Sequence, residues 1–193
     1  MPDGTVKYHY EEGNGEPDLS VLIKRAIGGD DAAFSQIYKL HSGKMYSLCK
    51  RYAGSSGDAD DFFQEGYIKV YRSLGAYSGS GSFEGWLRRI FVNTCLDFLR
   101  KKNNRFITVD EDSNADLQLI GTTEIPDKLS NDELVKMIQT MPDGYRIIVN
   151  LYLVEGYTHK EIADMLSISE GTSKSQLSKA KTKLKEMIIK SNA

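Results

Sequence analysis

The stretch YTHKEIADMLSISEGTSKSQLSKAKTKLK, residues 157–185, reads as two helices joined by a tight turn. Thr158 and Glu161 have the spacing of a capping box, which predicts the start of the first helix. Ile168 is the apolar residue that would fill the turn, and Ser169 can cap the second helix. This order of residues predicts a helix-turn-helix.

The second predicted helix separates an apolar stripe from a polar face. Spacings of three and four place one set of residues inward: Leu177, Ala180, Leu184, Met187 and Ile188. In helix-turn-helix proteins the N-terminal half of this helix enters the major groove, where polar side chains reach base edges and phosphates. We expect five exposed residues there to contact duplex DNA: Thr172, Lys174, Ser175, Gln176 and Lys179. The alternative is an amphipathic hairpin with a solvated lysine face, but the combined spacing favours the helix-turn-helix.

The charges of the chain are arranged in blocks, although the formal net charge of its 193 residues is only -2. Acidic residues dominate 1–18, 58–65 and 106–128, whereas basic residues dominate 87–105 and 172–185. Two basic segments joined by an acidic one indicate two contacts with nucleic acid and a cationic partner between them.

Helical periodicity runs through almost the whole sequence, and no strand-like alternation is convincing. We predict an all-α fold with two helical domains joined by an acidic flexible linker, the C-terminal one a helix-turn-helix domain. The predicted first domain is 19–105, the linker 106–128 and the second domain 129–193. An acidic, flexible N-terminal extension, 1–18, precedes them.

Three helices are expected in the first domain. Apolar residues recur at spacings of three and four over 34–52 and again over 63–74, with Tyr71 inward. A loop rich in glycine and serine, 75–82, follows, and Ser82 can cap the third helix. The inward stripe of that helix contains Phe83, Trp86, Ile90, Phe91, Cys95, Phe98 and Leu99.

Boundary signals also divide the second domain. Ser130 and Glu133 fit a capping box, and Pro142 ends the helix that follows them. Residues after Pro142 form another apolar helix, which Gly156 closes.

Composition limits the classes of protein and site. The sequence contains no run of about 18 apolar residues, so no membrane span is predicted. The polar N-terminus has no apolar signal-peptide core. Cys49 and Cys95 are expected to be buried free thiols of a reducing cytosol, which predicts a cytoplasmic protein. No Cys/His cluster predicts a metal, and we expect no cofactor and no catalytic residue. Three isolated histidines receive no catalytic or ligand role: His9, His41 and His159.

Three segments resemble regions of bacterial extracytoplasmic-function (ECF) RNA polymerase sigma factors. EGYTHKEIADMLSISEGTSKSQLSKAKTKLK (155–185) is similar to the region that reads the promoter −35 element, and DADDFFQEGYIKVYRSL (58–74) to the polymerase-binding helix. GSFEGWLRRIFVNTCLDFLRKK (81–102) is similar to the −10 region, with the pattern F-x-x-W-L-x-x-I-x-x-N-x-x-x-D-x-x-R intact. The resemblance covers about residues 19–105 and 129–190.

The resemblance implies a non-catalytic promoter-specificity subunit that binds core RNA polymerase for transcription initiation. Its implied partners are the clamp helices of the largest polymerase subunit, the flap of the second largest, promoter DNA and an anti-sigma factor, with no direct membrane insertion. One acidic helix face would meet basic groups on the clamp and set register and on-rate. That face consists of Asp58, Asp61, Gln64 and Glu65.

The resemblance also implies that the basic helix contacts the −10 element through Arg88, Arg89, Asn93, Arg100 and Lys101. The loop before it occupies the place where the family captures a flipped base, which could involve Tyr77, Ser78 and Ser80. A connecting loop without such a role is the alternative.

Five positions have a structural role or depart from the family pattern. Asp97 is expected to orient Arg100 or Lys101 through ion pairs. Trp86 is expected to pack in the core rather than act as a wedge in DNA. Ser173 replaces a usual apolar residue such as valine, which predicts looser packing, and Gln176 and Ser178 replace larger polar residues. The −35 preference is therefore expected to differ from the commonest one.

Three other classes of protein remain as alternatives. A stand-alone helix-turn-helix regulator that binds duplex DNA as a dimer shares the pattern of 157–185, but the motif from Phe83 to Arg100 argues against it. A nuclease could use the acidic residues of 58–65 to bind metal, but three of them form one helix face without a basic partner. A helical adaptor that binds only protein would leave both basic helices unexplained.

Overall fold

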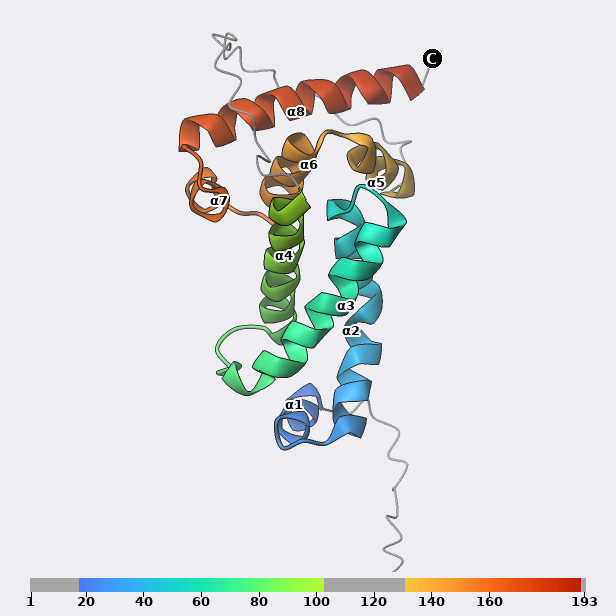
Figure 1. Cartoon of the computed structure of the whole chain (residues 1–193), viewed down its shortest axis with the longest axis vertical. Coiled ribbons are helices and arrows are strands. Elements are labelled where there is room, and N and C mark those ends of the chain that lie inside the picture. The colour runs from blue at the N-terminus through green and yellow to red at the C-terminus, as the bar shows by residue number, and fades with distance from the viewer. Residues whose placement is uncertain (1–17, 103–130, 192–193) are drawn as a thin grey trace, which may run out of the picture. The chain divides into compact units, whose positions relative to one another are not determined.

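The computed structural model describes residues 18–102 and 131–191, which contain helices and no strand. The first range contains α1 (Leu19–Ile27), α2 (Asp31–Tyr52), α3 (Ser56–Ser73), the 3-10 helix η1 (Leu74–Ala76) and α4 (Phe83–Lys102) (Figure 1). The second contains α5 (Asn131–Thr140), α6 (Asp143–Val149), the π-helix η2 (Asn150–Val154), α7 (His159–Leu166) and α8 (Glu170–Ser191). The predicted all-α fold is confirmed.

Several predictions lie outside the described residues: the flexible extension, the linker 106–128 and the Ser130 cap. The chain divides into two compact units, Met1–Leu40 and His41–Ala193. The domain boundaries given above stay predictions. Among the helices of the described ranges, none is both long enough and apolar enough to cross a membrane.

Helix α1 was not predicted as a separate element, although its signals are present in the sequence. Asp18 caps it by accepting a hydrogen bond from the N–H of Ser20, and Leu22 and Ile23 on its inner face are buried. Gly29, at a φ of 89°, turns the chain into α2. The signal was available in the sequence, because Leu19, Leu22, Ile23 and Ala26 recur at helical spacing over two turns.

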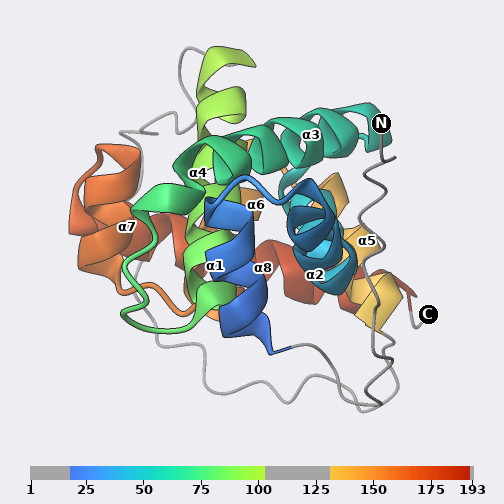
Figure 2. The same cartoon turned by 90° about the horizontal axis from the view of Figure 1, so that it is seen from below.

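Helices α3 and α4 pack closely against each other through aromatic rings (Figures 1 and 2). Phe91 of α4 lies edge-on to Tyr67 of α3, with ring centroids 5.2 Å apart. A Cβ atom at Gly66 would lie 2.3 Å from the Phe91 ring, so only glycine allows this approach. Ser82 caps α4 as predicted, since its Oγ accepts from the N–H of Gly85 at 3.0 Å.

The apolar stripe predicted for α3 is partly wrong. Phe62 is buried, whereas the neighbouring Phe63 is half-buried, and the ring of Tyr71 is 55% exposed. The reason is rotation of the helix about its axis, because the close contact at Gly66 turns Phe62 and Tyr67 toward α4. Tyr71 then faces outward.

The second described range has a core of its own. Helix α8 lies against α5 and α6 (Figure 1). Apolar residues of these helices and of the turn between α5 and α6 form one buried cluster: Ile138, Met141, Val149, Ala180, Leu184 and Ile188. Helix α5 ends at Thr140, before Pro142, as predicted. Gly156, at a φ of 79°, follows η2 where the sequence placed the end of the helix.

The helix-turn-helix has the predicted local geometry. Thr158 and Glu161 form both hydrogen bonds of the capping box at the start of α7. Ser167 adopts the left-handed conformation that ends α7, with a φ of 55°. Ser169 Oγ then accepts from the N–H of Thr172 at 2.9 Å and caps α8.

Candidate nucleic-acid and protein interfaces

The acidic face predicted on α3 is present, but its four residues are not equivalent. Asp61 and Gln64 are exposed and Glu65 is half-buried, one helical turn or less from each other. Asp58 is paired with Nζ of Lys102 at 2.9 Å. Burial opposes ionisation of Asp58, but the hydrogen bonds from Lys102 and Ser55 outweigh it and its pKa lies below the usual value. Asp58 is therefore the least available of the four to a partner.

An apolar strip that sequence reasoning missed continues this face of α3. Ile68 is 43% exposed and Tyr71 is 55% exposed, and they follow Gln64 at helical spacings of four and three. An exposed aromatic beside acidic side chains is typical of a protein-binding surface. The signal in the sequence was available, because a correct phase for the α3 stripe leaves both residues outside.

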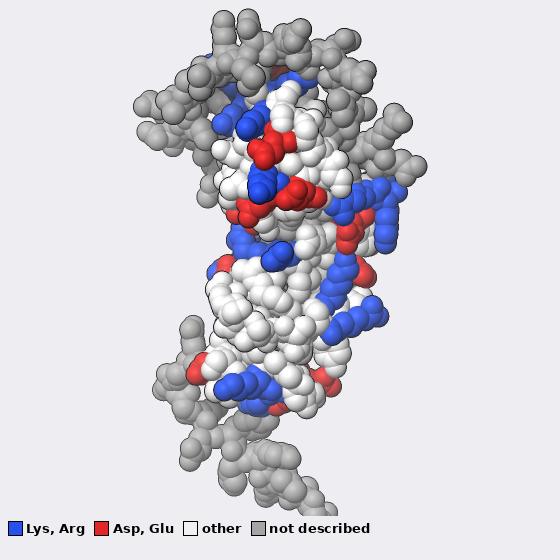
Figure 3. Space-filling view, turned by 90° about the vertical axis from the view of Figure 1, so that its left-hand side faces the viewer, with Lys and Arg blue, Asp and Glu red and all other residues white. Residues whose placement is uncertain are grey.

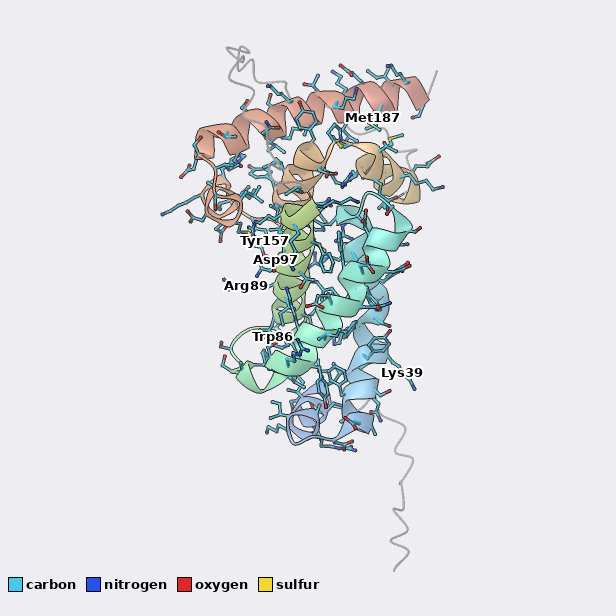
Figure 4. The ribbon with its side chains drawn as sticks, in the orientation of Figure 1. Lys39, Trp86, Arg89, Asp97, Tyr157 and Met187 are labelled. Carbon is cyan, nitrogen blue, oxygen red and sulfur yellow. The ribbon has the colours of Figure 1, made fainter. Side chains whose placement is uncertain are left out.

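Helix α4 presents the predicted basic face, and several of its cations have acidic partners. Arg89, Asn93, Arg100 and Lys101 are exposed. Figure 4 shows Arg89 and Asp97 along the same helix, and Figure 3 shows basic side chains interleaved with acidic ones over one face of the molecule. Asp97 pairs with Arg100 at 3.2 Å, so the predicted ion pair is present, whereas the orienting role stays a prediction.

Arg88 is held by an acidic residue from another part of the chain. Its Nη2 lies 2.7 Å from Oε2 of Glu155, whose side chain is 3% exposed. The other carboxylate oxygen of Glu155 pairs with Arg51 at 3.1 Å. Arg88 is thus partly neutralised in this structure, unlike Arg89.

A groove of about 400 Å³ lies between α3 and α4 beside the predicted contact Asn93. Its other lining residues are Lys69, Arg72, Ser73 and Ile90. Asp97 pairs with Lys69 at 3.0 Å, so it orders one wall of this groove as well as Arg100. Sequence reasoning missed Lys69 and Arg72 because they come from α3, and only packing of the two helices brings them to Asn93.

The loop before α4 is closed on itself by side-chain contacts. The ring of Tyr77 packs against Phe83 and Trp86, with centroids 5.1 and 5.4 Å apart. Its hydroxyl donates to the carbonyl of Gly81 at 3.0 Å, and the hydroxyls of Ser78 and Ser80 are 2.7 Å apart. Trp86 is half-buried and stacks on Phe83, in line with the expected packing role.

The predicted DNA-reading face of α8 is only partly exposed. Lys174 is exposed, whereas Thr172, Ser175 and Lys179 are half-buried. The expectation that Gln176 is exposed is wrong, because its side chain is 7% exposed. Gln176 precedes the inward-facing Leu177, so it lies at the edge of the buried stripe rather than on the outer face.

The sequence predicted loose packing at Ser173, because serine stands there in place of a usual apolar residue. The structure does not show loose packing at this position. Ser173 is fully buried, and its Oγ is hydrogen bonded to Nδ1 of His159 at 2.9 Å. The His159 ring stacks on Tyr152, with centroids 4.4 Å apart. The hydrogen-bonded pair of Ser173 and His159 therefore fills the place where an apolar contact was expected.

The two cysteines lie in the interior of the protein. Cys49 and Cys95 are both buried and free, as predicted. Burial raises the pKa of the Cys95 thiol well above its usual value, and its hydrogen bond with Cys49 adds to this. Over residues 18–102 and 131–191, no three His, Cys, Asp or Glu side chains are grouped so that they could hold a metal ion.

Comparison with known proteins matches the two described ranges to two regions of one protein family. The family model for sigma-70 region 2 matches residues 37–105, and the model for sigma-70 region 4 matches residues 131–184. The ECF RNA polymerase sigma-E factor of Escherichia coli K12 is 31% identical over 173 residues, covering 83% of this chain and 89% of that protein. The ECF RNA polymerase sigma factor SigE of Mycolicibacterium smegmatis is 30% identical over 84% of this chain, which spans 65% of that protein's length.

A solved structure has the same fold. The sigma factor RpoE from Bartonella quintana, in a co-crystal with the anti-sigma factor NepR, matches with a TM-score of 0.51 and 18% identity, covering 81% of this chain and 96% of that one. Two family models in chain order, and a relative of which this chain covers 89%, leave one conclusion. The chain belongs to the ECF RNA polymerase sigma factor family, with sigma-70 region 2 spanning most of α2 together with α3 and α4, and region 4 spanning α5 to α7 and most of α8.

Proposed function

We propose that this sigma factor binds core RNA polymerase through α3 and directs it to promoters through α4 and α8. One observation carries the proposal. Each family region has a helix with exposed cations beside a packed core, α4 in region 2 and α8 in region 4. Two such helices, one in each family region, suit two DNA elements.

The clamp helices of the largest polymerase subunit are the proposed partner of α3. Asp61, Gln64 and Glu65 would meet its basic groups, and Ile68 and Tyr71 would supply the apolar part of the contact. Asp58 would join only after Lys102 releases it. The flap of the second largest subunit is the proposed partner of region 4.

The −10 element is the proposed ligand of α4 and of the groove beside it. Arg89, Arg100 and Lys101 would neutralise phosphates, and Asn93 would contact a base or the backbone. Lys69 and Arg72 give the groove two further cations at Asn93, which suits a nucleotide taken out of the duplex. Arg88 would join once its contact with Glu155 opens.

The −35 element is the proposed ligand of α8. Lys174 offers the most exposed cation, with Thr172, Ser175 and Lys179 beside it. Tyr77, Ser78 and Ser80 keep the proposed role of contacting a flipped base near the −10 element, which requires Tyr77 to leave its packing on Phe83.

An anti-sigma factor is the proposed regulatory partner, because the solved neighbour is a sigma factor in complex with one. Such a partner would act by covering the surfaces of α3, α4 or α8. The whole process takes place in the cytoplasm, where promoter DNA and polymerase meet, and the chain contributes binding without chemistry of its own.

A reconstitution with bacterial core polymerase tests the proposal. The purified chain is mixed with core polymerase on a sizing column, and the mixture and each component are assayed on promoter DNA fragments. Co-elution with promoter-specific transcripts from the mixture alone is expected. Failure to co-elute, together with tight duplex binding by the chain alone as a dimer, would instead establish the stand-alone regulator.

A further inference from the structure

His159 joins three elements of the helix-turn-helix, although the sequence gave it no role. It is the first residue of α7, its Nδ1 is hydrogen bonded to the buried Ser173 of α8, and its ring stacks on Tyr152 of η2. The two ring planes are 24° from parallel. These contacts fix the ring orientation and assign Nδ1 to Ser173, which leaves Nε2 as the nitrogen able to meet a ligand.

The surroundings of this ring are basic. Burial is the main cause that lowers the pKa of His159, Lys174 and Lys181 lower it further, and Glu170 opposes them. All three charged groups come from α8, while η2 contributes the Tyr152 ring. The pKa of the free ring is therefore held below its usual value, in a place where a negative ligand would favour the charged form of the ring.

The position of the ring in the motif identifies that ligand. In helix-turn-helix docking the second helix enters the major groove and the first helix crosses the DNA backbone. His159 begins the first helix, and its partner Ser173 directly precedes Lys174, the exposed cation of the second. A DNA strand placed along α8 would bring a phosphate to this corner.

We propose that His159 is a phosphate contact for −35 DNA, positioned by Ser173 and Tyr152, and that −35 binding takes up a proton at its ring. This inference rests on the proposed −35 role of α8. The phosphate stabilises the imidazolium, so the bound pKa lies above the free pKa. Affinity is then constant above the bound pKa, rises as the pH falls through it, and levels off below the free pKa. A pKa rise of about one unit corresponds to about a tenfold increase at most.

Equilibrium binding of assembled holoenzyme to a promoter fragment tests the inference, with measurements from pH 8.0 to pH 6.0. A matched fragment with a scrambled −35 element gives the part of the affinity that depends on −35 DNA. For the wild type this part is expected to increase about threefold to tenfold as the pH falls, for one proton taken up. His159→Asn keeps an amide near the Nδ1 position for Ser173, but it lacks Nε2 and does not titrate, so it should lose the pH dependence and bind more weakly at pH 6.0.

Lys160→Ala is the matched control, because Lys160 is the next residue of α7 and is exposed. It should retain the pH dependence of the wild type. Equal affinity and equal pH dependence of wild type and His159→Asn would overturn the inference and leave the histidine a packing role only. If the scrambled fragment binds as well as the cognate one at every pH, the proposed −35 function itself fails, which is a different result.

Discussion

Gly66 of α3 is the position where a single atom has the largest structural consequence. An added Cβ would lie 2.3 to 2.8 Å from three atoms of the Phe91 ring of α4. The ring is fully buried and packed against Tyr67, so it has little space to move. The distance between α3 and α4 therefore depends on this glycine.

Gly66→Ala should lower the free energy of unfolding by about 1–3 kcal/mol, because overpacking forces α3 away from α4. Gly43→Ala in α2 is the control, since nothing lies within 4 Å of its added Cβ. That change should stabilise the protein by about 0.4–1 kcal/mol. Urea denaturation followed by circular dichroism measures both, and equal effects of the two changes would show that Phe91 yields without cost.

Helix α3 combines acidic and apolar side chains on one exposed face. Asp61, Gln64, Ile68 and Tyr71 follow one another at spacings of three and four. Charge on such a face steers association, and the apolar part supplies contact area. Asp61 and Tyr71 are both exposed, so substituting each one alone separates the effect of charge from the effect of apolar contact.

Asp61→Lys should weaken binding to core polymerase by about tenfold, which corresponds to about 1.4 kcal/mol, mostly through a slower association rate. Surface plasmon resonance with immobilised core enzyme measures the rate. Asp31→Lys, which makes the same charge change at an exposed position of α2 outside both matched regions, is the control and should leave core binding unchanged. Normal core affinity of the Asp61 variant would mean that α3 does not meet the clamp.

Lys174→Ala should reduce promoter-dependent transcription without loss of core binding, because it removes the most exposed cation of the α8 face. The slope of log affinity against log salt should fall by about one phosphate contact. Lys190→Ala in the last turn of α8 is the control. Transcription at the wild-type level from the cognate promoter would refute the contact.

At the scale of the whole molecule, buried polar bonds join residues distant in sequence within the unit 41–193. Glu155 holds both Arg51 and Arg88, and the buried Arg146 donates from Nε to the carbonyl of Tyr52 at 2.9 Å. Asn150 donates to the carbonyl of Arg51 at 2.9 Å. Buried groups of this kind cost stability when one partner is removed, because the other remains desolvated.

Glu155→Ala should lower the free energy of unfolding by about 1–3 kcal/mol, a range reduced because Arg88 is partly exposed to solvent. Glu186→Ala is the control, since Glu186 is exposed and pairs with Lys183 only at 3.8 Å. Its effect should stay below about 0.5 kcal/mol. Chemical denaturation of the two variants at equal salt measures both effects. Indistinguishable unfolding midpoints of the Glu155 and Glu186 variants would show that Glu155 contributes no net stability.

The sequence by itself determined most of the helices, several of their caps and the family. Capping at Thr158, Ser82 and Ser169 depends on hydrogen bonds between residues three positions apart, so it can be predicted from the sequence alone. The pairing of Asp97 with Arg100 is local for the same reason. The family motif was recognisable because its residues recur at fixed helical spacing.

Only the tertiary structure decided the rotation of the helices and the partners of their side chains. The outward position of Tyr71 and the burial of Gln176 depend on which face meets a neighbouring helix, and helical periodicity leaves that phase uncertain by one residue. Lys69 lines the same groove as Asn93, and His159 is hydrogen bonded to Ser173, although the members of each pair come from different helices. Such contacts arise from packing, which no spacing along the chain encodes.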